Sequence, residues 1–282
     1  MFKRGERFEI ARARAEGREP RIYHGLFSSH PAPDARAVQA AKGAARLENG
    51  PPGGWIDGRD TYLERIDGLT YGSSRAQGIV RGNRFYHGEL GITLAFPSGW
   101  TIDNQRDRLL AFTPSKDSLV QVTLETPPPN QGPREFLLSR LGGARVAGGE
   151  AITVNGMEGY TVRTSSGSPL DRGAGPVRWT VLYRGKSAYI FAGASRASRG
   201  GIPESDGLFV SVAQTLRGLK PAEFPLAEPY RIRVRTATAD TRLEDYADNV
   251  PVERFQKEEL LLINGLYPNR TLRPGDRYKV VE

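Results

Sequence analysis

The chain has 282 residues, about twice the length of a typical single domain, so two or three compact units are expected. It contains no cysteine, which excludes disulfides, thiol catalysis, iron–sulfur clusters and zinc sites built on thiolates. The net charge is +8, but its arginines and lysines are spread along the chain and interleaved with acids, so no nucleic-acid partner is expected. No apolar run has the roughly 18 residues of a transmembrane segment, and no secretion signal peptide is recognisable at the charged start.

Residues 1–80 favour helices and turns. Gly5 to Glu16 is rich in helix-forming residues, and Ala35 to Leu47 is an alanine-rich segment that ends at a run of glycine and proline. A third helix is expected from Tyr62 to Leu69, where Thr61 and Glu64 have the spacing of a capping box. This part of the chain is therefore expected to be helical.

Residues 81–220 are expected to form a separate unit with six or seven strands and a helix against a face. Alternating or continuous apolar residues mark the strands, and apolar residues at helical spacing (Leu208, Val212, Leu216 and Leu219) mark the longer of two helices. The expected strands include 92–96, 120–124, 179–183 and 188–192, and the expected helices are 133–141 and 205–219.

Residues 221–229 read as a proline-rich linker, and residues 230–282 as a small module with the order strand, helix, helix, strand. The expected fold class is α+β. It combines a helical N-terminal part, an antiparallel sheet sandwich with helices, and a βααβ module. The expected elements of the module are 231–236, 243–249, 252–263 and 277–281.

Several catalytic motifs are missing from the sequence. It has no His-Glu-x-x-His pair, no Gly-x-Ser-x-Gly elbow, no phosphate-binding Gly-x-x-x-x-Gly-Lys loop and no dinucleotide fingerprint after a strand. Of its three histidines, His24 and His87 have no motif around them and read as surface or turn residues. His30 stands in a Ser-His-Pro turn before a helix and is the exception.

Two N-terminal segments carry a resemblance to a known family. Residues 7–17 and 26–36, with His30 in a Ser-His-Pro turn and Arg36 six residues later, resemble the end of the catalytic domain in bacterial zinc metallopeptidases of family M forty-eight, which includes the HtpX-like and BepA-like enzymes. The resemblance implies that His30 faces the zinc cleft and that Arg36 orders the helix closing it. Residues 68–72 and 78–82 resemble the connector that follows in longer members.

The resemblance implies a zinc cofactor for the intact family and none for this chain alone. The zinc-binding helix would precede Met1, and one histidine leaves three coordination positions unfilled. His30 is then a metal ligand only beside a complementing half, or else it hydrogen-bonds within its own turn. We therefore expect the non-catalytic C-terminal region of a zinc-dependent metalloendopeptidase that acts in protein quality control in the periplasm or cell envelope. Its partners would be the missing catalytic half or envelope proteins.

The C-terminal module resembles LysM, a βααβ family that binds peptidoglycan and related glycans. The resemblance is carried by residues 238–241, 264–266 and 272–281, with Ala239 where the family usually has glycine. It places a glycan groove between two loops, formed by Asp240, Thr241, Asn264, Gly265 and Leu266. The other interpretation is a degenerate module that serves only for packing or docking.

The middle unit resembles the PsbP-like sandwich through the turn Phe96-Pro97-Ser98-Gly99-Trp100, in which Trp100 is expected to anchor a core. Fold similarity of this kind implies no chemistry. The alternative function for the whole chain is a free-standing envelope adaptor or peptidoglycan-binding protein with no hydrolytic role.

Overall fold

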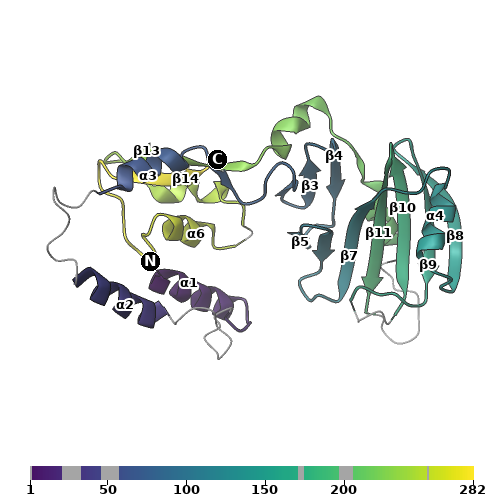
Figure 1. The fold of residues 1–282 in the computed structure, drawn as a ribbon, viewed down its shortest axis with the longest axis horizontal. Helices are drawn as coiled ribbons and strands as arrows, with labels where there is room; N and C mark the ends of the chain where they lie inside the picture. Colours follow the sequence, from purple (N-terminus) through teal and green to yellow (C-terminus); the bar gives the residue numbers. More distant parts are fainter. Residues whose placement is uncertain (1, 21–32, 46–56, 171–174, 197–205, 253) are drawn as a thin grey trace. The chain divides into compact units, whose positions relative to one another are not determined.

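The computed structural model describes residues 2–20, 33–45, 57–170, 175–196, 206–252 and 254–282 (Figure 1). The α+β class is confirmed, because helices accompany three sheets whose paired strands are antiparallel. The chain forms two compact units, Met1–Gly72 with Tyr230–Glu282, and Ser73–Pro229. The four segments expected from the sequence thus combine into two units, because strand β1 (Thr70–Tyr71) pairs with β13 (Tyr230–Thr236) across the chain.

The larger unit is built on a seven-stranded sheet with the order β5-β6-β7-β11-β10-β9-β8. Along β11 the side chains alternate between two cores: Tyr189 and Phe191 belong to one, Ala188 and Ile190 to the other. Both faces of the central strands are therefore buried. The strands are β5 (Thr101–Asn104), β6 (Leu109–Phe112), β7 (Ser118–Glu125), β8 (Val146–Val154), β9 (Met157–Thr164), β10 (Val177–Arg184) and β11 (Ser187–Ser195).

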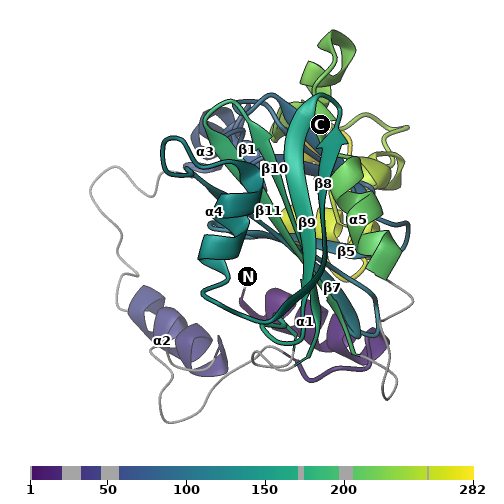
Figure 2. The same cartoon turned by 90° about the vertical axis from the view of Figure 1, so that its right-hand side faces the viewer.

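Two helices cover opposite faces of this sheet. Helix α4 (Pro133–Arg140) buries Phe136 and Leu137 against the face that carries Ile190. Helix α5 (Asp206–Gln214) buries Phe209 and Val212 against the other face. Figure 2 shows α4 and α5 on the two sides of the strands β8 to β10.

A second, four-stranded sheet with the order β12-β4-β3-β2 shares the α5-side core with the large sheet. Trp100 is buried in this core, which confirms the expected anchor. The two sheets therefore form a sandwich, as expected. The strands are β2 (Ile79–Arg81), β3 (Arg84–His87), β4 (Ile92–Ala95) and β12 (Arg217–Gly218).

One expectation for this unit is wrong. The second helix ends at Gln214 instead of Leu219, because the Thr215 hydroxyl bonds to the Ala95 backbone, at 2.9 Å from its N–H and 3.0 Å from its C=O, and the chain then pairs with β4. The expected linker also has structure. It contains the 3-10 helix η1 (Pro221–Ala227), which the bidentate ion pair of Glu223 with Arg217 ties to β12.

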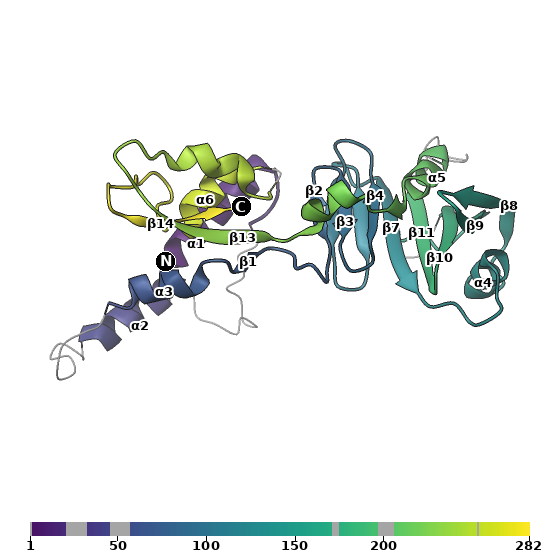
Figure 3. The same cartoon turned by 90° about the horizontal axis from the view of Figure 1, so that it is seen from above.

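The smaller unit is organised around the three-stranded sheet β1-β13-β14. The expected order of strand, helix, helix, strand is confirmed for residues 230–282, although η2 is a 3-10 helix (Figure 3). Its core holds Leu260, Leu261, Tyr278 and Val280. The elements are α1 (Phe2–Ala15), α2 (Pro33–Ala45), α3 (Arg59–Ile66), η2 (Leu243–Asn249), α6 (Gln256–Ile263) and β14 (Arg277–Val281).

The three expected N-terminal helices are present, with shifted ends. The capping box of Thr61 and Glu64 is wrong, because α3 begins earlier, after Gly58, and its N-terminus has no side-chain cap. Helix α1 packs on the C-terminal module: the Phe8 ring stands edge-on to Tyr267 at 5.4 Å and to Phe255 at 6.4 Å. The N-terminal and C-terminal segments therefore share one packed interface.

Candidate functional site

The residues expected at a metal cleft lie in the N-terminal segment, only part of which the structure describes. His30 and His24 lie outside the described residues, and Arg36 lies in α2. Within the described ranges, no three His, Asp or Glu side chains are grouped so as to hold a metal ion. The described residues therefore do not fit a zinc site by themselves.

The five expected glycan-binding residues divide into two groups. Asp240 is exposed in the turn after β13, where the Thr241 hydroxyl accepts a hydrogen bond from the Thr238 N–H at 2.8 Å and closes the turn. Asn264, Gly265 and Leu266 follow α6. Asp240 is accessible, whereas Thr241 is half-buried and the second group is largely occupied by contacts within the unit.

Asn264 links the end of α6 to β14. Its Nδ2 donates to the carbonyls of Leu260 at 2.9 Å and Lys279 at 2.8 Å, and its Oδ1 accepts from the Lys279 N–H at 2.7 Å. Both amide hydrogens are used, so the side chain has no donor left for a sugar. Gly265 has a φ of +68° and accepts a hydrogen bond from Arg4 of α1, while Leu266 packs against the core.

The three arginines of β13 are exposed, and each contacts a neighbouring part of the chain. Arg235 pairs with Glu282 and its guanidinium lies 5.3 Å from the centre of the Tyr246 ring. Arg231 donates to the Gly68 carbonyl at 2.8 Å, and Arg233 lies 3.9 Å from Asp67. These contacts tie the middle strand of the sheet to the chain segments beside it.

A pocket that the sequence analysis did not identify lies between the two sheets of the larger unit. It has a volume of about 200 Å³. Its walls are apolar: Phe85, Ile92 and Leu94 come from the small sheet, and Leu109 and Val122 from the large one. The sequence contains no pattern that identifies the pocket, because each of these residues has the pattern of an ordinary core position in a strand.

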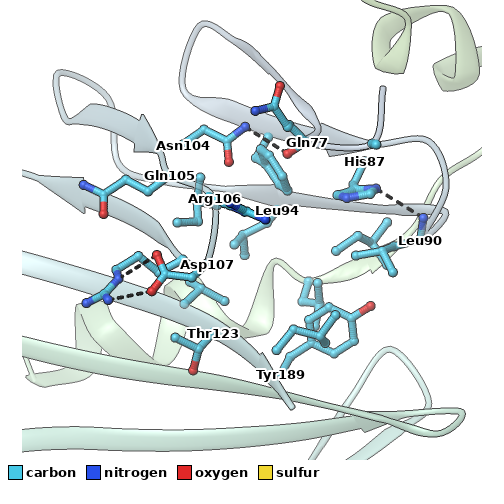
Figure 4. Close-up of a pocket in the computed structure, with 18 residues that line it drawn as sticks. Gln77, His87, Leu90, Leu94, Asn104, Gln105, Arg106, Asp107, Thr123 and Tyr189 are labelled. Carbon is cyan, nitrogen blue, oxygen red and sulfur yellow. Dashed lines mark hydrogen bonds and ion pairs between the residues drawn. The ribbon is translucent and has the colours of Figure 1, made fainter. Parts of the chain in front are cut away.

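Polar side chains surround the mouth of this pocket. Figure 4 shows Asn104, Gln105 and Asp107 on one side, and His87, Leu90 and Tyr189 on the other. Asn104 Nδ2 donates to the carbonyls of Gln77 at 2.9 Å and Gly78 at 3.0 Å, and so holds the segment before β2 against the end of β5. The polar side thus comes from the turn joining β5 to β6.

His87 and Tyr189 are uncharged at neutral pH. Burial lowers the pKa of His87 below its usual value, and its Nδ1 accepts the Leu90 N–H at 3.2 Å. Burial likewise raises the pKa of Tyr189, an effect that Arg184 partly opposes. The lining residues on this side therefore contribute hydrogen-bonding groups but no charge, although the Glu89 carboxylate lies close enough to oppose the effect of burial on the pKa of His87.

The charged side carries two arginines and one carboxylate. Arg108 and Asp107 form an ion pair at 2.6 Å and compensate each other. Arg106 also lines the pocket, and within the described part of the chain no hydrogen bond or ion pair involves its guanidinium. Among the residues that line the pocket, the charges therefore sum to one positive charge, at Arg106.

No protein-family model matches this chain. No curated protein matches it either. Among solved structures, it is similar to cyanobacterial PsbP (CyanoP) from Synechocystis sp. PCC 6803, with 13% identity and a TM-score of 0.37 over 53% of this chain and 98% of that one. It is also similar to a protein from Bacteroides thetaiotaomicron, with 14% identity and a TM-score of 0.36 over 66% of this chain and 69% of that one. A PsbP structure is thus among its structural neighbours.

Proposed function

We propose that this chain is the non-catalytic region of a zinc-dependent metalloendopeptidase of the bacterial cell envelope, and that the zinc-binding helix belongs to a separate segment. The proposal rests on the Ser-His-Pro turn with Arg36 six residues after His30, and on the absence of His-Glu-x-x-His from the sequence. No step of hydrolysis is assigned to this chain, because its described residues do not assemble a metal site. Within the described residues, no helix is long and apolar enough to cross a membrane.

The structural observation that supports the proposal is the exposure of the described side chains of helix α2. All described side chains of this helix, residues 38–45, are exposed, and Val38 is 54% exposed. Lys42 is the one charged residue among these eight, and four of the others are alanine. Helix α2 contacts α1 within the smaller unit. A helix of 13 residues is nevertheless marginal without more extensive packing, and the exposed side chains of residues 38–45 are accessible to a partner. The missing catalytic half is the occupant that the resemblance implies.

The test of this proposal is the nucleotide sequence immediately upstream of the Met1 codon. The proposal expects a continuous or neighbouring reading frame that encodes His-Glu-x-x-His followed by a downstream glutamate. An upstream region with no such frame would contradict it and favour the adaptor function.

Peptidoglycan binding is the second candidate function, and the βααβ order with the exposed Asp240 turn favours it. The experiment is sedimentation of the full chain with purified peptidoglycan. Asp240→Ala is expected to reduce sedimentation, while Asp248→Ala, at an exposed position of η2, serves as the matched control. No sedimentation, or an equal effect of both substitutions, would leave the module only a docking role.

A further inference from the structure

The pocket between the two sheets is large enough to hold a small apolar group. Protein interiors are close-packed and contain few voids larger than a water molecule. A cavity of about 150 Å³ lined by apolar side chains accepts a benzene-sized molecule. The pocket here is about 200 Å³ and has walls of comparable character, since Ile92 and Leu94 are 3% and 2% exposed. Its walls can therefore surround an apolar group of six to eight carbon atoms, roughly a benzene ring or slightly more.

The charged residues at the mouth indicate which head group a bound ligand would carry. His87 and Tyr189 are neutral, and the Asp107 carboxylate is compensated by Arg108. The Arg106 guanidinium is the remaining charge on the lining, and its planar donors match a carboxylate. The amides of Gln77 and Gln105 border the same mouth, although Nε2 of Gln105 already donates one hydrogen bond to Asp103 Oδ2 at 2.7 Å. The geometry thus favours an anion over a neutral or cationic head group.

We propose that this pocket binds a small carboxylate with an apolar body, and that Arg106 holds the carboxylate while the apolar body enters between the two sheets. Two kinds of ligand combine a carboxylate with an apolar body in this way: a free medium-chain carboxylate, and a peptide that ends in an apolar residue. The site lies wholly within residues 76–216 and does not depend on the proposed peptidase function.

The experiment is an NMR titration of the full chain with octanoate, followed at the amides of His87, Leu124 and neighbouring pocket residues. Octanol is the neutral analogue with the same body. Octanoate is expected to shift the pocket amides and to bind more tightly than octanol. The proposal is overturned if octanoate does not perturb these amides, or if octanol binds equally well.

Substitutions then test whether the positive charge of Arg106, and not the shape of the pocket alone, determines the affinity for octanoate. Arg106→Gln is expected to weaken octanoate binding about fivefold, the effect of losing one partly exposed ion pair, and to leave octanol binding unchanged. Arg134→Gln is the matched control, because Arg134 is exposed on α4, away from the pocket lining. Gln105→Glu, which places a negative charge on the same lining, provides a second variant and is expected to weaken octanoate binding as well. Equal weakening by Arg134→Gln would overturn the assignment.

A pair of peptides distinguishes the two kinds of ligand. One peptide ends in a leucine with a free carboxylate, and the other has the same sequence with a C-terminal amide. Tighter binding of the free carboxylate identifies a peptide C-terminus as the ligand. Binding of octanoate without binding of either peptide identifies a free acyl carboxylate.

Discussion

Asn264 and Lys279 exchange two hydrogen bonds: Asn264 Nδ2 donates to the Lys279 carbonyl at 2.8 Å, and the Lys279 N–H donates to Asn264 Oδ1 at 2.7 Å. The amide side chain thereby acts as an extra strand partner for β14. Because Asn264 also bonds to the Leu260 carbonyl, it fixes the end of α6 to the sheet. An asparagine that the LysM resemblance places in a glycan groove therefore has a clear structural role.

Asn264→Ala is expected to lower the free energy of unfolding of the smaller unit by about 1–3 kcal/mol, because it leaves half-buried backbone groups without partners. Thermal unfolding followed by circular dichroism measures this loss. Asn269→Ala, at an exposed position in the following loop, is expected to have no effect. Equal stability of the two variants would show that the Asn264 side chain does not stabilise the unit.

Gly193→Ala is expected to destabilise the larger unit by about 1–3 kcal/mol through overpacking. An added Cβ at Gly193 of β11 would lie 2.2 Å from Cγ of Phe209 in α5, so the helix would have to move off the sheet. Gly207→Ala is the control within α5, where a Cβ has open space and a gain of up to about 1 kcal/mol is expected. Denaturant unfolding followed by tryptophan fluorescence suits the test, since Trp100 and Trp179 lie in this unit. A stable Gly193→Ala variant would show that α5 packs differently.

The stability of the larger unit is expected to fall at acid pH because the Glu223 carboxylate becomes protonated and loses its ion pair with Arg217. Hydrogen bonds from Arg217 and from the Lys220 backbone lower the pKa of this carboxyl from 4.5 to about 2. A pKa that is lower in the folded state means that the stabilisation is complete above about pH 4.5 and is lost as the pH falls through 2. Denaturant titrations across this range should show a shallower decline for Glu223→Gln than for the unsubstituted chain. Glu158→Gln, at an exposed site, should leave the slope unchanged.

The purified chain is expected not to cleave casein when zinc is supplied, because its sequence lacks the zinc-binding pair and the general-base glutamate between them. Release of labelled casein fragments measures this. Cleavage that a chelator abolishes, and that persists after further purification, would contradict a non-catalytic role.

Local patterns in the sequence predicted most individual elements. The strands around Val120 and Ile190, the helix from Pro133 and the βααβ order of the last 53 residues follow from apolar periodicity and from glycine and proline positions. The shortened helix α5 was not predictable in this way. Its apolar stripe continues to Leu219, but the pairing of Arg217 with Thr93 overrides helical propensity.

Features that join distant parts of the chain could not be predicted. The pairing of Thr70 with Arg231 joins strands 161 positions apart, and no local pattern encodes it. The pocket could not be predicted for the same reason, because its walls come from strands of two sheets and its charge comes from a turn. In the sequence, Arg106 is one of three charged residues in the run Arg106-Asp107-Arg108, and only the fold shows which of the two arginines is paired.

The most direct test of the proposed missing partner is amide hydrogen exchange in helix α2 of the isolated chain. The central strand β11, buried on both faces, provides the internal reference for slow exchange. The account predicts that the amides of residues 38–45 exchange far faster than those of β11, because a short helix whose described side chains are exposed is marginally stable and opens readily. Protection of these amides close to that of β11 would mean that α2 is fully packed within this chain, and it would contradict the account.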